Sequence, residues 1–147
     1  MGHVDHAARQ WFVLSLLPLT AGVGILEKLV RGLRQGKDAG LAVGMYCISA
    51  LGFVQVAITL WVLLSADLAV TETSHDAIIM VGLAYALLHG GLGAVLTLLQ
   101  GLRVGYGYVG AHAPFEPAVV AQWWRYNLVT FWILVGTLAV LPRVIGS

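Results

Sequence analysis

The chain has 147 residues and a formal net charge of +1; hydrophobic residues make up 59% of it and charged residues only 10%. Soluble domains carry roughly 25% charged and 45–50% apolar residues, so this composition excludes an ordinary soluble protein. The near-zero charge offers no basic surface for nucleic acid. The single cysteine, Cys47, excludes an internal disulfide and a thiolate metal cluster.

Four long apolar runs account for most of the sequence, and they lie at residues 11–30, 41–66, 77–102 and 118–141. An α-helix needs about 20 apolar residues to cross the roughly 30 Å of hydrocarbon in a bilayer. We therefore predict an all-α integral membrane protein, a transmembrane four-helix bundle in which residues 1–147 form a single domain. Residues 1–10 lack a small-residue cleavage site, so we expect the first run to be a retained span rather than part of a signal peptide.

Residues that begin, bend or end helices flank the runs. The first run contains Pro18, which can kink its helix. The third run is preceded by N-cap candidates, the Ser-His-Asp sequence at 74–76. Pro114 and Pro117 stand before the last run, where proline suits the opening turn of a helix, and Pro142 is expected to end it.

The connections between the runs differ in charge. Basic residues surround the first connection, 33–40, and flank the third, 103–117, while the second, 67–76, is acidic and has no Lys or Arg. Positively charged loops stay on the cytoplasmic side of a membrane. We therefore expect the first and third connections inside a bacterial cytoplasmic membrane, and the second connection and both termini outside. The charged residues concerned are Lys28, Arg31, Arg34 and Lys37, then Asp67, Glu72 and Asp76, then Arg103 and Arg125.

Small residues recur every four positions along one stripe of the third run: Gly82, Ala86, Gly90 and Ala94. Such a stripe lets the backbones of neighbouring helices approach closely, which favours association where lipid provides no hydrophobic incentive. We therefore predict that this face of the third helix packs against another helix.

Polar residues at membrane depth are few, and His89 is the only histidine inside a run. A haem held by two histidines needs a second one facing it, and a proton relay needs a carboxylate in the core. The middle of the runs offers neither, so a histidine hydrogen-bonded between helices is favoured over a ligand, and no catalytic, cofactor-binding or metal-binding residue is predicted. Glu27 and Lys28 either reach the interface or pair with charges on a neighbouring chain. The other polar residues at this depth are Gln55, Thr59, Asn127 and Thr130.

Several short motifs follow one another in a particular order. They are Thr-Ala-Gly-Val at 20–23, Leu-Gly-Phe at 51–53 with Gln55, Leu-His at 88–89 with Gly93 and Arg103, Phe-Glu at 115–116 and Trp-Arg-Tyr at 124–126. In order, spacing and inferred topology, these motifs resemble subunit III of cytochrome c oxidase. The resemblance covers about residues 20–141 and corresponds to the last four helices of that seven-helix subunit.

The chain also departs from that family. Ala86 and Arg125 stand where the family often has histidines, and the family's Trp-Ala-His-His and Glu-Tyr motifs are absent near residues 27–30 and 59–61. The family's early helices, which carry its buried carboxylate and much of its lipid cleft, have no counterpart in these residues. The departures argue against a proton-conducting role, and the pattern is most similar to shortened subunit III domains, including those fused behind subunit I.

What the resemblance implies is a non-catalytic accessory subunit of a respiratory haem–copper terminal oxidase, not an enzyme. Such a subunit binds no haem or copper; both are expected in its partners, catalytic subunit I and the other subunits. It packs against the catalytic subunit, holds phospholipid and supports proton uptake. The resemblance makes His89, Gly93 and Arg103 structural or subunit-contact residues, although Arg103 and Arg125 are equally explained as ordinary positive-inside residues. Lipid or subunit contact is expected for Arg103, Arg125, Trp124 and Glu116.

Three alternatives stay open at this point. In a haem-binding anchor subunit of a quinone-linked complex, His89 would ligate haem from one side and a partner chain would supply the second ligand. A small transporter component would need broken helices, inverted repeats or an ionisable pair at the midplane. A subunit-III-like protein that accompanies a nitric oxide reductase would show the same motifs as an oxidase subunit.

Overall fold

The computed structural model describes residue 10 and residues 13–65 and 74–145, with backbone alone at residue 75 and at residues 138–145. The described chain is all-α and contains no strand. Its helices are α2 (Leu16–Arg34), α3 (Leu41–Ser65), α4 (Ser74–Gly105) and α5 (Phe115–Ile145). The predicted all-α class with four helices is therefore confirmed.

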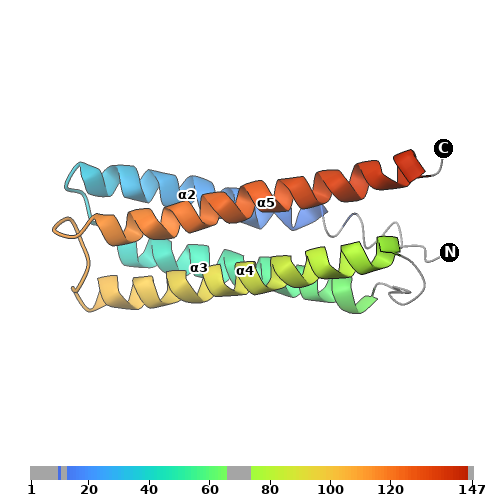
Figure 1. Ribbon diagram of the computed structural model, residues 1–147. Helices are drawn as coiled ribbons and strands as arrows, with labels where there is room; N and C mark the ends of the chain where they lie inside the picture. The colour runs from blue at the N-terminus through green and yellow to red at the C-terminus, as the bar shows by residue number, and fades with distance from the viewer. Residues whose placement is uncertain (1–9, 11–12, 66–73, 146–147) are drawn as a thin grey trace.

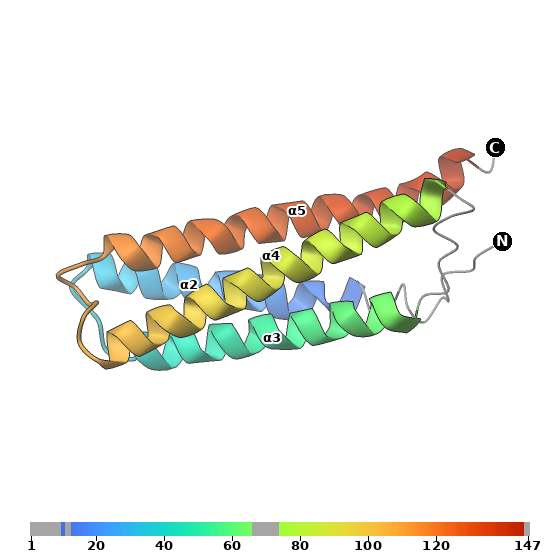
Figure 2. The same ribbon diagram turned by 60° about the horizontal axis from the view of Figure 1, so that its bottom comes forward.

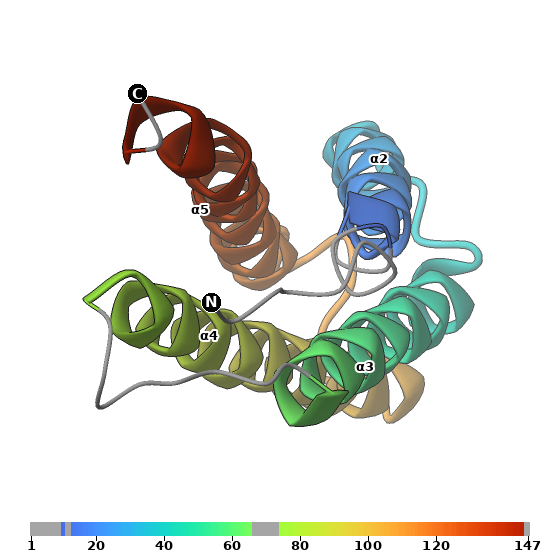
Figure 3. The ribbon, with the colours of Figure 1, turned by 90° about the vertical axis from the view of Figure 1, so that its right-hand side faces the viewer.

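The helices form an elongated antiparallel bundle (Figure 1). Each helix packs against the next one along the chain, and α5 closes the bundle by packing against α2. Viewed along its length, the bundle has the helices at the corners of a square (Figure 3). The α3–α4 contact is the most extensive, and α4 is inclined to its neighbours (Figure 2). The described α2–α3 and α4–α5 connections therefore lie together at one end, and the start of α4 lies at the other.

Proline has different effects in α2 and in α5. Val13 and Leu14 are helical, but Ser15 forms a turn and α2 begins at Leu16. Pro18 has no N–H to bond to the carbonyl of Leu14, so the expected kink is an interruption of the helix at Ser15. The last helix starts at Phe115 with Pro117 in its first turn, as predicted, but it continues through Pro142 to Ile145.

The prediction that Pro142 ends the last helix is therefore wrong. Proline removes one hydrogen bond to the preceding turn, yet its own φ is helical and lets the residues after it continue. The start of α4 at Ser74 agrees with the predicted boundary. The residue that precedes Ser74 lies outside the described residues, as do residues 1–9, Trp11, Asp67 and Glu72, on which other predictions fall.

Two helices are long and apolar enough to cross a membrane, α3 over Leu41–Ser65 and α4 over Asp76–Gly105. Only 33% of the most apolar stretch of each is buried inside the structure, so most of that surface faces outward, unlike a core helix of a soluble protein. Within the described residues, α2 and α5 do not meet the same test; α2 carries Glu27, Lys28, Arg31 and Arg34 in its second half. Membrane association is therefore indicated by α3 and α4.

Large apolar side chains project outward from every described helix. Extensive exposed apolar surface on a protein marks contact with another protein or with a membrane. Exposed examples are Leu17 on α2, Val43 and Leu64 on α3, Val81 and Leu88 on α4, and Trp132 and Ile133 on α5.

Trp124 of α5 fills the centre of the bundle. Its indole is 2% exposed, and its Nε1 donates to Thr97 Oγ1 of α4 at 2.7 Å. A Cβ at Gly22 of α2 or at Gly52 of α3 would lie 3.0 Å from a carbon of the indole. One side chain therefore contacts the other three helices, and the two glycines provide the space for it.

Replacing Trp124 is expected to loosen the whole bundle. Trp124→Ala should lower the free energy of unfolding by about 3–5 kcal/mol, because it leaves a cavity at the meeting point of the helices. Trp124→Phe keeps an aromatic ring but loses the hydrogen bond to Thr97, and should cost about 1 kcal/mol. The measurement is the unfolding transition in detergent, followed by circular dichroism. Trp132→Ala, on the exposed side of α5, is the control and should change little.

Candidate functional site

His89 lies in the middle of α4, half-buried against α5. Its Nδ1 lies 3.1 Å from the carbonyl oxygen of Tyr85, one turn earlier. Because a carbonyl only accepts, Nδ1 carries the proton and Nε2 is left as an acceptor. The imidazole stacks on the Tyr85 ring, with centroids 3.8 Å apart, and lies nearly parallel to the Trp123 ring at 5.8 Å. The tautomer and the plane of the ring are therefore both fixed.

The backbone carbonyl of His89 holds α5 against α4. Trp123 Nε1 donates to it at 3.4 Å and Asn127 Nδ2 at 3.2 Å. Gly93 makes this approach possible, since a Cβ there would lie 3.0 Å from Trp123 Nε1 and 3.1 Å from Asn127 Nδ2. The Tyr85 and Tyr126 hydroxyl groups form a further hydrogen bond between the same helices.

The stripe of small residues lies on the inner side of α4. Ala86 and Ala94 are buried, and a Cβ at Gly82 would meet Leu134 of α5. A Cβ at Gly90 would overlap Gln55 Oε1 of α3. The structure thus places Gly82, Gly90 and Ala94 at contacts with α3 or α5, and Ala86 in the hydrophobic core.

Buried hydroxyl and amide groups join α3 to α4 or satisfy each other locally. Ser49 Oγ of α3 donates to the carbonyl of Ala94 at 2.9 Å. Gln55 Nε2 donates to Thr59 Oγ1 at 3.1 Å, and Thr59 Oγ1 donates to the Gln55 carbonyl at 2.9 Å. Among the described residues, the buried side-chain atom left without a partner is Asn127 Oδ1.

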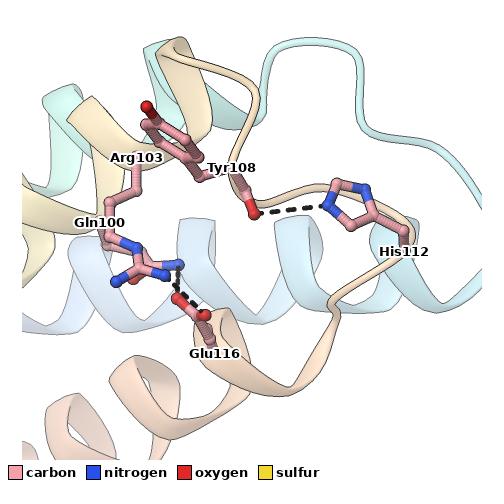
Figure 4. A network of polar contacts seen from close by, with 5 residues as sticks. All are labelled: Gln100, Arg103, Tyr108, His112 and Glu116. Carbon is pink, nitrogen blue, oxygen red and sulfur yellow. Dashed lines mark hydrogen bonds and ion pairs between the residues drawn. The ribbon is translucent and has the colours of Figure 1, made fainter.

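Charged residues gather at the end of the bundle that carries the α2–α3 and α4–α5 connections. Arg103 at the end of α4 donates to Glu116 at the start of α5, at 2.9 Å. Gln100 Nε2 lies 3.5 Å from the other oxygen of that carboxylate. In the loop between the helices, His112 Nε2 lies 3.4 Å from the Tyr108 carbonyl (Figure 4). The Arg103–Glu116 ion pair therefore bridges the α4–α5 connection.

A second ion pair joins the first and last described helices. Glu27 of α2 pairs with Arg125 of α5, and Arg125 Nη1 also donates to Gln122 Oε1 at 3.3 Å. Of the two roles expected for Glu27, pairing is the one found, but its partner belongs to the same chain rather than to a neighbour. This pair links the second half of α2 to α5.

Trp124 departs from its predicted role. It was expected at an interface with lipid or another subunit, but its burial among the helices leaves no surface for such a contact. Its position was readable from spacing, because Val120, Trp124, Asn127 and Phe131 share one face of a helix and all are buried. Arg103, Arg125 and Glu116 keep partly exposed side chains, and their contact with lipid or a subunit stays a prediction.

Sequence reasoning missed the aromatic partners of His89, which are Tyr85 on the same helix and Trp123 on α5. Tyr85 could have been found, because residues four positions apart on a helix are neighbours. Trp123 could not, since no local signal connects residues on different helices. In the part of the chain that the structure describes, no group of three or more His, Cys, Asp and Glu side chains is placed to hold a metal ion. Cys47 is exposed.

Comparison with known proteins adds no relative: no protein-family model matches the chain, and no curated protein is significantly similar to it in sequence.

Gly93→Ala is expected to separate α4 from α5. The new methyl group would displace Trp123 and Asn127 from the His89 carbonyl, and overpacking of this kind costs about 1–3 kcal/mol. The matched control is Gly91→Ala, because a Cβ at Gly91 meets nothing within 4 Å. That variant should be neutral or gain up to about 1 kcal/mol from helix propensity. Equal unfolding temperatures for the two variants would contradict the assigned role of Gly93.

Proposed function

We propose that the chain is a non-catalytic accessory subunit of a respiratory haem–copper terminal oxidase, similar to cytochrome c oxidase subunit III. The observation that carries the proposal is the place of the motif residues His89 and Gly93. Both serve the α4–α5 contact, with the His89 carbonyl as acceptor and Gly93 as the gap that admits the donors. In this proposal, the motif formed by His89 and Gly93 serves to join helices and not to carry out a reaction.

The outward apolar faces of α3 and α4 support an assembly role. They are the helices best suited to a membrane, and most of their apolar surface is free of the bundle itself. Lipid and a larger membrane subunit are the two environments that cover such surface. The chain then contributes a rigid block beside the catalytic subunit, while haem and copper stay in that partner.

We further propose that all four helices cross the membrane and that the connection-bearing end is cytoplasmic. The charges of α2 lie at this end, and Glu27 there is paired with Arg125. Exposed aromatic side chains of the α4–α5 region, Tyr106, Tyr108 and Phe115, lie at the same end. Aromatic and basic residues together are typical of a cytoplasmic interface.

A haem-binding anchor subunit is the second candidate. It is favoured by the tautomer of His89, because metal-ligating histidines commonly donate their other N–H to a backbone carbonyl and leave the free nitrogen for the metal. The stacking of Tyr85 and Trp123 on the imidazole argues against haem binding, since both rings occupy space that a haem would need.

Cysteine labelling tests the membrane orientation. In a Cys47→Ala background, Lys37→Cys marks the α2–α3 connection and Ser74→Cys marks the opposite end of the bundle; both positions are exposed. An impermeant maleimide should label Ser74→Cys in spheroplasts, and Lys37→Cys only in inverted vesicles. Labelling of both from the same side would contradict a spanning α3, and the reversed pattern would contradict the orientation alone.

Affinity purification of the tagged chain in mild detergent tests the function. Haem and copper should arrive with a larger partner of many spans, detected by visible spectrum and metal analysis, and should be lost when the chain is separated from it.

The outcomes separate the candidates. Haem that stays with the isolated chain and is lost in His89→Ala, but kept in the control His112→Ala, would replace the oxidase proposal with the haem-anchor function. A colourless preparation without a partner would contradict both.

A further inference from the structure

Asn127 has an unmet hydrogen-bonding requirement inside the bundle. The residue is 5% exposed, and its Nδ2 donates to the His89 carbonyl at 3.2 Å. That bond fixes the orientation of the amide, because the flipped amide would set two oxygens against each other. Oδ1 consequently points away from the carbonyl and finds no donor among the described residues. A buried acceptor in this state is costly, and it requires a donor.

A small cavity lies beside Asn127. Residues of all four described helices line it, among them Gln55, Ala86, His89, Asn127 and Thr130, and its volume is about 10 Å³. This is close to the space that one water molecule needs. A quinone ring, a haem or a lipid headgroup is far too large for it.

The polar side chains of the lining form their hydrogen bonds with groups other than Asn127 Oδ1. Gln55 Nε2 donates to Thr59 Oγ1, Thr130 Oγ1 donates to the Tyr126 carbonyl, and His89 Nδ1 bonds the Tyr85 carbonyl. The lining residues therefore carry acceptors, the Asn127 amide oxygen and the His89 Nε2 atom, and none of their donors reaches Asn127 Oδ1. A ligand that donates two hydrogen bonds fits this chemistry.

We propose that this cavity binds one ordered water molecule, which donates to Asn127 Oδ1 and completes the hydrogen bonding between α4 and α5. Water is the ligand whose size and two donors match the cavity, and buried waters typically have two to four polar partners. The site does not depend on the oxidase proposal, because it belongs to the interior of the bundle. Its role is structural, because the bound water donates to Asn127 Oδ1, an atom that the His89 carbonyl cannot serve.

The first test is a high-resolution experimental structure of the full chain with any partner that copurifies. Density for a single water within hydrogen-bonding distance of Asn127 Oδ1 is expected. An empty cavity, or one filled by an acyl chain or by a partner's side chain, would overturn the proposal.

A double-mutant cycle gives an independent test in solution. Ala86→Val adds methyl groups to the cavity wall and displaces the water, so it should lower the unfolding temperature in the presence of Asn127. In an Asn127→Leu background there is no acceptor to strand, and the same substitution should cost clearly less. The overpacking strain of valine is common to both backgrounds and cancels in the comparison. Equal losses in the two backgrounds would overturn the proposal even if the single variants are unstable.

Discussion

The indole of Trp124 occupies a space that exists because Gly22 and Gly52 have no side chains, and the arrangement of the four described helices depends on this fit. In lipid, helices gain little from hiding apolar surface, so close packing and hydrogen bonds between helices must hold a bundle together. Trp124 supplies both, because its ring packs against α2 and α3 while its N–H bonds Thr97 of α4.

The helix α4 is held in a second way, through its own backbone. Ser49 of α3 donates to the Ala94 carbonyl, and Trp123 and Asn127 of α5 donate to the His89 carbonyl. Trp123 and Asn127 come close enough to the His89 carbonyl because Gly93 has no side chain. In this chain His89, Gly93 and Trp123 together form a contact between α4 and α5. The proposed role in assembly rests on this contact.

Much of the fold follows from local information in the sequence. The apolar runs predict the four helices, and small residues at four-residue spacing predict the inner side of α4. Contacts between distant segments do not follow in this way: neither the pairing of Glu27 with Arg125 nor the stacking of Trp123 on His89 has a local signal. Trp124 was misplaced because tandem tryptophans near a span end are typical of an interface, whereas its helical face, shared with Asn127 and Phe131, points inward. The prediction that Pro142 ends α5 was wrong because proline removes one hydrogen bond but keeps a helical φ, so the helix can continue after it.

We propose that the described helices form one bundle immersed in a bilayer, with α5 as a full member although composition alone does not mark it as a span. Trp132 lies on the outer side of α5 and is 57% exposed, so in a bilayer it should meet acyl chains. The most direct measurement is tryptophan fluorescence in vesicles whose acyl chains carry bromine, for the unchanged chain and for Trp132→Phe. We expect strong quenching that falls in the variant without vanishing, because Trp132 and Trp61 (63% exposed on α3) face the acyl chains while Trp124 is shielded inside the bundle. Quenching that is absent, or that is unchanged in Trp132→Phe and lost in Trp124→Phe, would contradict it.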